Sequence, residues 1–258
     1  MTRGALSGRT AIVASAGHGI GHGAAATSCA LSRAGASVVL AARDGQALAA
    51  LAADLGAAGG QAVAVPTDLA SPVSVRRLVE QTLGAFGRLD AACNDVACRP
   101  AASDAAGCEG AASCGAAGCD PGCDCAAQVR GLSLALKYEI QAMRRTGGCI
   151  VNLVPSDGPQ AAVVELTREA SLDLAGSGVR VNAVATGPLA GPLAGPLAGP
   201  LAGPVAGSGG AEAGSGGAEG VAHTVLWLCS DAASAITGKA LYVRSGPCCD
   251  SGGLPPRT

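Results

Sequence analysis

The stretch VASAGHGIGHGAA, residues 13–25, decides the fold because closely spaced glycines there join an apolar run to a helical pattern. The run TAIVAS at 10–15 is typical of a buried strand, and the residues after the glycines predict a helix to about Arg33. Gly19, Gly21 and Ala24 match the spacing G-x-G-x-x-G/A, in which backbone amides and a helix N-terminus hold a diphosphate. The stretch therefore predicts a dinucleotide-binding turn, and a tight glycine turn without a ligand is the alternative.

Strand and helix patterns alternate along most of the chain. Further apolar runs typical of strands lie at 36–42, 61–68, 89–94, 150–154, 178–184 and 239–245. Between most of them lie helical patterns, one of which has Ser71 as N-cap and Pro72 at its first position. Strands separated by helices require crossover connections and a parallel sheet. We therefore predict a single α/β domain over residues 1–258, with a doubly wound, Rossmann-like sheet.

The end of the second predicted strand indicates which dinucleotide binds. An acidic residue at this place would hold the ribose 2′-hydroxyl of NAD, but the strand ends at Ala42 and Arg43 follows. A guanidinium suits the 2′-phosphate of NADP. The sequence therefore predicts NADP in preference to NAD, and the alternative is that Arg43 is an ordinary solvated charge.

The charge balance excludes one class of partner. The formal net charge is −2 and the pI is about 5.9. No block of Lys and Arg stands out, so we expect no nucleic-acid and no membrane partner. The longest charge-free region, 181–211, is too rich in Pro and Gly to span a bilayer, and the N-terminal apolar run is too short for a signal peptide. We expect a cytoplasmic protein with reduced thiols.

Two segments interrupt the alternation. Residues 98–125 hold six cysteines among Ala and Gly, without a C-x2-C pair or a nearby His, so an irregular segment of biased composition is expected and metal binding is the alternative. Residues 188–219 consist of PLAG and AGSGGAE repeats, which predict a flexible segment. Cys29, Cys93 and Cys149 lie within helix or strand patterns and are expected to be small core residues.

From about Leu6 to Gly246 the chain resembles the classical short-chain dehydrogenase/reductases, in the ordered landmarks LSGRTAIV, GHGIG, AGASVVLAAR, TDLAS, GRLD, LALKYEIQAM, GCIVN and VRVNAVATGP. The resemblance implies a homodimer or homotetramer that transfers a hydride between NAD(P) and a small alcohol or carbonyl substrate. It implies that Asp68 meets the adenine, Asn94 the adenosine ribose, and Thr186 with Gly187 the nicotinamide. The full set of expected cofactor-binding residues is Ser15, Gly17, His18, Gly19, Ile20, Gly21, Arg43, Asp68, Leu69, Asn94, Thr186 and Gly187.

The chain departs from the family pattern mainly at the reaction centre. The Asn-Asn-Ala-Gly motif is reduced to Asn-Asp-Val-Ala at 94–97, and the active-site Asn of the fourth helix falls at Gln128. The catalytic Ser falls on Pro155, which leaves Ser156, one place later, as the catalytic candidate. The Tyr-x-x-x-Lys motif that should follow is absent.

The missing motif leaves no obvious proton donor. A phenol protonates a developing alkoxide only when a neighbouring ammonium lowers its pKa, and neither Tyr138 nor Tyr242 has a Lys four residues later. An unassisted Ser156 hydroxyl could at most donate a hydrogen bond. Three functions therefore stay open: an oxidoreductase of unknown alcohol or carbonyl substrate, a catalytically inactive relative that binds dinucleotide or forms oligomers, and a thiol-rich metal binder.

Overall fold

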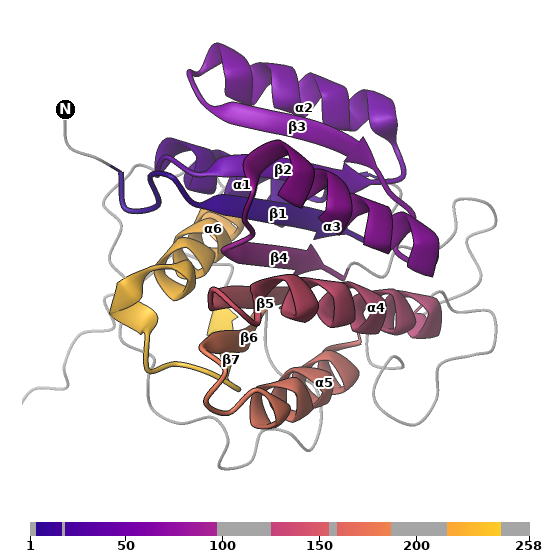
Figure 1. Cartoon of the computed structure of the whole chain (residues 1–258), viewed down its shortest axis with the longest axis vertical. Helices are drawn as coiled ribbons and strands as arrows, with labels where there is room; N and C mark the ends of the chain where they lie inside the picture. Colours follow the sequence, from indigo (N-terminus) through magenta and orange to yellow (C-terminus); the bar gives the residue numbers. More distant parts are fainter. Residues whose placement is uncertain (1–3, 17–18, 97–124, 155–158, 187–215, 244–258) are drawn as a thin grey trace, which may run out of the picture.

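Seven parallel strands form the centre of the computed structural model, which describes residues 4–16, 19–96, 125–154, 159–186 and 216–243 (Figure 1). The strand order is β3-β2-β1-β4-β5-β6-β7, and every pairing is parallel. The order runs outward from β1 in one direction and from β4 in the other, which is the doubly wound arrangement. The predicted Rossmann-like sheet is confirmed.

The elements follow the predicted alternation closely. The strands are β1 (Thr10–Ser15), β2 (Ser37–Ala42), β3 (Gln61–Pro66), β4 (Ala91–Asp95), β5 (Gly148–Val154), β6 (Val179–Thr186) and β7 (Ala240–Val243). The helices are α1 (His22–Arg33), α2 (Gly45–Ala57), α3 (Pro72–Phe86), α4 (Cys125–Met143), α5 (Gln160–Asp173) and α6 (Gly216–Cys229), with a short 3-10 helix at Asp231–Ala233. Because the strands are parallel, all their carboxyl ends lie at one edge of the sheet.

Helices cover both faces of the sheet. In Figure 1, α3, α4 and α5 lie in front of it, whereas α1 and α6 lie behind. Successive strand residues point to opposite faces, so Ile12 packs into the core under α3, α4 and α5, and Val13 packs into the core with α1, α2 and α6. Both cores consist mainly of Ala, Val, Leu and Ile. Cys93 and Cys149 are buried in the second core, as predicted, and Cys29 is half-buried beside it.

Local chemistry sets the ends of the helices. The Ser71 hydroxyl accepts a hydrogen bond from the amide of Ser74 (3.4 Å), and Pro72 occupies the first turn of α3, which confirms the predicted start. The same helix is followed by Gly87 as its C-cap, whose φ of 74° is the left-handed conformation that glycine adopts without strain. These signals are local, which is why the sequence reveals them.

The last residues of the two unusual segments are helical, which the sequence did not predict. Helix α6 begins at Gly216, so the last residues of the 188–219 segment are helical, and Cys125 is the first residue of α4. Burial of Val221 and Val225 against α1 extends α6 beyond what its Gly-rich composition favours. The predictions for 98–124 and 188–215 lie outside the described residues. Among the described helices, none is long and apolar enough to cross a membrane.

Candidate functional site

The glycine turn lies where β1 and β4 end side by side. Ser15 pairs with Asp95, and the amide of Ala16 donates to the Asp95 carbonyl (2.9 Å). Helix α1 begins immediately afterwards, and its N-cap, Gly21, provides no side-chain cap for the amides of the first turn. Uncapped amides at a helix N-terminus suit an anion such as a diphosphate. This part of the site fits a dinucleotide.

The two described glycines of the turn differ in their surroundings. A Cβ placed on Gly19 would have no atom within 4 Å, so this glycine borders open space. A Cβ on Gly21 would lie 2.7 Å from Oδ2 of Asp95. Ile20, between them, is half-buried against the core that holds α1, and Ser15 is buried. Gly17 and His18 lie outside the described residues.

The charged residues after β2 have different roles. Arg43 is exposed at the carboxyl edge of the sheet, directly after the last residue of β2. The next residue, Asp44, caps α2: its Oδ1 accepts hydrogen bonds from the amides of Gln46 and Ala47, both at 3.0 Å. A ribose-binding acid would stand at the end of β2, and the first carboxylate after that place, Asp44, is instead hydrogen-bonded to α2. Sequence reasoning missed this role, although an Asp before a helical pattern is a recognisable cap signal.

Asp68 and Leu69 follow β3 at the same edge. The Asp68 carboxylate is exposed and accepts a hydrogen bond from the amide of Ala70 (3.0 Å), while its own amide donates to the hydroxyl of Ser74 (3.1 Å). Leu69 is buried and packs against α4, because a Cβ added to Gly131 would lie 3.2 Å from the Leu69 Cβ. A cofactor contact of Leu69 would therefore involve its main chain.

The nicotinamide side of the predicted site is only partly described. Thr186 is the last residue of β6 and so lies at the same edge as Ser15, Arg43 and Asp68. Gly187 and Ser156 lie outside the described residues, and Ser156 stays a prediction. Gln128, at the place of the family's active-site Asn, is buried near the beginning of α4.

The Asn94 side chain is turned into the protein. Its Nδ2 donates to Oε2 of Glu139 (2.9 Å) and to Oδ1 of Asn152 (3.4 Å), and only 1% of the residue is exposed. The Nδ2 of Asn152 in turn donates to the hydroxyl of Thr167 on α5 (2.9 Å). A contact between Asn94 and an adenosine ribose therefore depends on main-chain atoms, and the assignment stays a prediction.

Glu139 is the acid that sequence reasoning missed. Burial raises the pKa of its carboxyl from the usual 4.5 to about 7, and the hydrogen bond from Asn94 opposes this shift. Asn94 Oδ1 and Glu139 Oε1 are buried acceptors without a hydrogen-bond donor. A protonated Glu139 is itself a donor, so the neutral acid could satisfy both the amide and the carboxyl. The signal was an acidic residue on the apolar stripe formed by Leu132, Leu136 and Met143.

Neither tyrosine is arranged as a proton donor. Tyr138 lies on α4, and the ammonium of Lys137 sits 5.6 Å from the centre of its ring. Tyr242 lies on β7, and burial raises the pKa of its phenol, which makes it a weaker acid. The second lysine of the chain, Lys239, precedes β7 and therefore lies at the amino edge of the sheet, opposite the glycine turn. The arrangement fits a dinucleotide, but among the described residues no phenol and ammonium lie together at the carboxyl edge of the sheet, where the glycine turn is.

Comparison with known proteins decides the family. The family model described as Enoyl-(Acyl carrier protein) reductase matches residues 14–247. A short chain dehydrogenase/reductase of Aspergillus oryzae, astE, is 33% identical over 93% of this chain and 95% of its own. The chain belongs to the short-chain dehydrogenase/reductase family. A 2,5-dichloro-2,5-cyclohexadiene-1,4-diol dehydrogenase of Sphingobium indicum is 36% identical, with coverage of 93% and 97%.

Solved structures of other dehydrogenases share the fold. The citronellol catabolism dehydrogenase of Pseudomonas aeruginosa superposes with a TM-score of 0.68 at 23% identity, over 95% of this chain and 97% of that one. A short chain dehydrogenase from Mycobacterium smegmatis gives 0.67 at 24% identity, over 95% of each chain. Short-chain dehydrogenase/reductases use nicotinamide dinucleotides and small-molecule substrates, so the glycine turn lies in a protein of a dinucleotide-using family.

Proposed function

We propose that this short-chain dehydrogenase/reductase binds a nicotinamide dinucleotide weakly, prefers NADP to NAD, and does not turn over a substrate. The observation that carries the proposal is the uncapped N-terminus of α1 at the glycine turn, in a chain without Tyr-x-x-x-Lys. Amides of the first turn and the partial positive charge of the helix end would hold the diphosphate. A bound nicotinamide would be the group that supplies or accepts a hydride in an active relative.

The missing step is proton transfer. Reduction of a carbonyl places negative charge on its oxygen, and a tuned acid must neutralise that charge. Glu139 holds a proton near neutral pH, but it is only 1% exposed and hydrogen-bonded to Asn94, so it lies inside the protein rather than at a substrate. Tyr242 is a weak acid because its phenol is partly buried. Binding without turnover follows from these positions.

The preference for NADP follows from the residues after β2. Arg43 brings an exposed positive charge to the carboxyl edge, and the neighbouring carboxylate of Asp44 is hydrogen-bonded to two amides of α2. A 2′-phosphate would gain from the guanidinium, whereas the carboxylate of Asp44 caps α2 through its Oδ1 instead of standing at the end of β2, where a 2′-hydroxyl would be held. The same residues give NAD no comparable contact.

Titration calorimetry with NADPH and NADH tests binding and preference together. We expect NADPH to bind more tightly than NADH, and Arg43→Gln to weaken NADPH by about tenfold, the value of one charge-assisted contact, with little effect on NADH. Arg77→Gln, which removes an exposed charge from α3, is the matched control and should change neither affinity. Equal or tighter binding of NADH by the unchanged protein would defeat the preference.

An active oxidoreductase is the second candidate. The relatives favour it, since two of them are named 2,5-dichloro-2,5-cyclohexadiene-1,4-diol dehydrogenase and A-factor type gamma-butyrolactone 1'-reductase (1S-forming). An alcohol or carbonyl compound would then be the substrate. The oxidation of NADPH by carbonyl compounds, followed on the sample used for calorimetry, separates the candidates. Turnover well above the rate without protein, and surviving Ser156→Ala, would support this second candidate and place its acid elsewhere.

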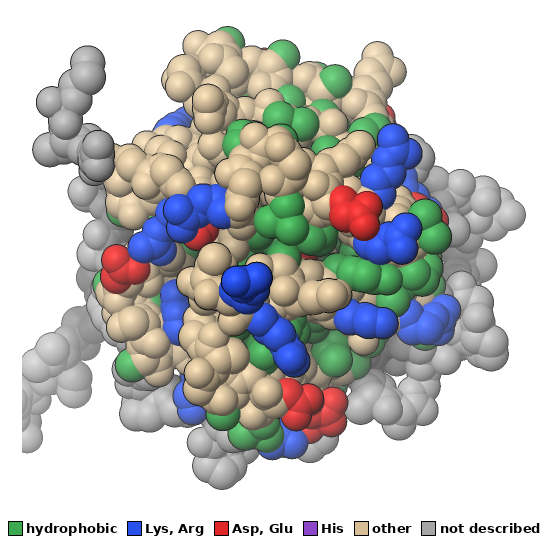
Figure 2. Space-filling view, in the orientation of Figure 1, with side chains coloured by type: hydrophobic (Ala, Val, Ile, Leu, Met, Phe, Trp, Pro, Cys, Tyr) green, Lys and Arg blue, Asp and Glu red, His purple; other side chains and the backbone are tan. Residues whose placement is uncertain are grey.

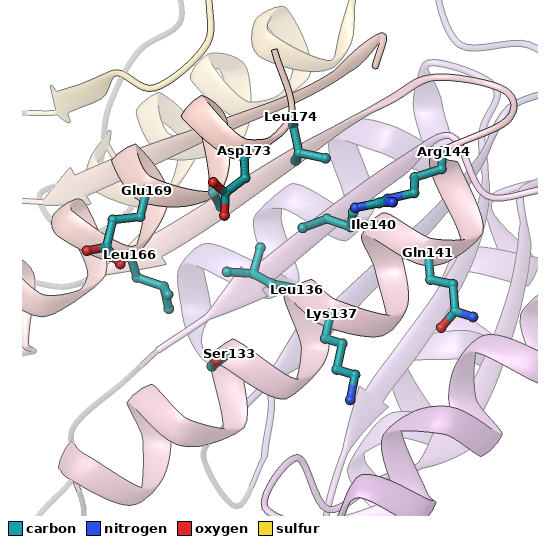
Figure 3. A pocket seen from close by; sticks show the side chains of 11 residues that line it. Ser133, Leu136, Lys137, Ile140, Gln141, Arg144, Leu166, Glu169, Asp173 and Leu174 are labelled. Atoms are coloured by element: carbon teal, nitrogen blue, oxygen red, sulfur yellow. The ribbon is translucent and has the colours of Figure 1, made fainter. Parts of the chain in front are cut away.

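We also propose a cytoplasmic homodimer or homotetramer. A cavity of about 520 Å³ lies between α4 and α5, where Leu136, Ile140 and Leu174 meet (Figure 3). The cavity is bordered by basic side chains on the α4 side, Lys137 and Arg144, and by acidic side chains of α5, Glu169 and Asp173. Over this face of the molecule, apolar side chains lie among charged ones (Figure 2). Basic and acidic rows of this kind are complementary across a twofold axis. Light scattering should show an oligomer that Arg144→Glu weakens and Arg77→Glu does not.

A further inference from the structure

The carboxylate of Asp95 lies against the N-terminus of α1. Asp95 is the last residue of β4, and its main chain is hydrogen-bonded to the residue after β1. Side chains alternate along a strand, so Asp95 points to the same face as Cys93, which packs in the core with α1. Only 7% of Asp95 is exposed, and a Cβ on Gly21, the N-cap of α1, would lie 2.7 Å from its Oδ2.

This position gives the carboxylate the same electrostatic partner that a diphosphate would have. The end of α1 carries a partial positive charge, and neither its N-cap nor its first turn contains an acidic residue of its own. A buried carboxylate beside that end neutralises part of the charge and is screened less by salt than a surface group. An arriving diphosphate would meet a second negative group on the inner side of the turn.

We propose that Asp95 is a specificity-determining residue that weakens the binding of anionic dinucleotides by repelling their diphosphate. This inference rests on the proposed function, because it concerns the same glycine turn. It explains weak binding by a turn whose glycine spacing and uncapped helix otherwise fit the ligand. The replacement of Asp95 by the uncharged isostere Asn should therefore improve binding rather than damage it.

Calorimetric titration of the full chain with NADPH, and separately with adenosine, tests the inference. We expect Asp95→Asn to bind NADPH about tenfold more tightly, since one charge a few ångströms from a diphosphate at an effective dielectric of about 20 has an effect of at least that order. Adenosine lacks the diphosphate, so its affinity should not change. Asp54→Asn removes an exposed carboxylate from α2 and should leave both affinities unchanged.

The outcomes separate this inference from the proposed function. Measurable NADPH binding by the unchanged protein with equal or weaker binding by Asp95→Asn would overturn the role of Asp95 and leave the proposed function standing. An equal gain for adenosine would also overturn it, because the effect would not concern the diphosphate. No binding by either protein would refute the proposed function and the inference with it. Thermal unfolding checks that Asp95→Asn folds. If Asp95→Asn does not fold, the titrations are done with Asp95→Ser, which is also uncharged.

Discussion

The connection from β1 to α1 offers main-chain amides, whereas the connection from β5 to α5 is where the family places catalytic side chains. Both connections start at the carboxyl edge of the sheet. The first ends at Gly21 and leaves the amides of α1 without a side-chain cap. The second, residues 155–159, ends at Pro159 and stands where the family carries its catalytic Ser and, beyond it, Tyr-x-x-x-Lys. A turn that binds through main-chain amides tolerates changes of sequence that would remove a catalytic side chain.

The contrast continues beneath the two connections. On the face of α1 and α6, the sheet packs through small apolar side chains such as Cys93, Val151 and Val225. On the face of α4 and α5, Asn94, Asn152, Glu139 and Thr167 form a buried hydrogen-bonded group. We call the face of α4 and α5 the reaction side, and the face of α1 and α6 with its glycine turn the cofactor side. We expect the stability of the reaction side to depend on polar side chains and on pH. The stability of the cofactor side should depend on close packing at the glycine turn.

The largest expected effect concerns the charge of Glu139. Its pKa is raised from 4.5 in the unfolded chain to about 7 in the folded protein, so the stability it contributes is fully present below about pH 4.5 and is lost as the pH rises through about 7. The difference is on the order of 3 kcal/mol in the free energy of unfolding. Glu139→Gln has no charge to bury, so from about pH 5 to about pH 8 the variant should gain stability relative to the unchanged protein.

Urea unfolding across that pH range measures this difference. Glu80→Gln is the matched control: Glu80 is exposed on α3 beside Arg76, so its replacement should leave the pH dependence as it is. Parallel pH profiles for the unchanged protein and Glu139→Gln would show that Glu139 is not the titrating group. The contrast between the two sides of the sheet would then lose its pH component.

A smaller effect is expected from Asn152. Asn152→Ala removes the donor to Thr167 (2.9 Å) and the acceptor for Asn94 (3.4 Å), and leaves buried polar atoms without partners. We expect a loss of about 2 kcal/mol in the free energy of unfolding. Ser171→Ala removes a half-buried hydroxyl of α5 that donates only to the Arg168 carbonyl of its own helix (2.7 Å), and should cost less than about 0.5 kcal/mol. Equal midpoints in urea for the two variants would indicate that the buried group does not stabilise the reaction side.

Local patterns in the sequence predict most of the fold. Apolar runs such as TAIVAS and the cap at Ser71 and Pro72 depend on neighbours along the chain, so the strands and most helix limits are correct to within a few residues. Helix α6 begins earlier than its composition suggests because packing against α1 extends it. Packing between distant segments is not visible in such patterns.

The candidate site is predictable to a smaller extent for the same reason. The glycine spacing places the turn between β1 and α1 correctly, because closely spaced glycines are a local signal. The turning of Asn94 towards Glu139 joins β4 to α4, and the approach of Asp95 to Gly21 joins β4 to the start of α1. Both contacts bring together residues far apart in sequence, and no single stretch announces them. Proton transfer depends on such contacts, which is why sequence alone left it open.

The smallest expected effect compares the two glycines of one turn. Neither glycine has a left-handed backbone, so the effect of an alanine substitution depends only on the atoms that its Cβ would meet. Gly21→Ala brings a Cβ to 2.7 Å from Asp95 Oδ2, and the carboxylate must move, at about 1 kcal/mol in the free energy of unfolding. Gly19→Ala meets no atom within 4 Å and should be neutral or stabilise the fold by up to about 0.5 kcal/mol, since alanine restricts the unfolded chain. Differential scanning calorimetry of the pair measures the difference. If both substitutions cost the same, close packing against Asp95 does not distinguish the cofactor side, and the contrast with the reaction side reduces to the buried polar group.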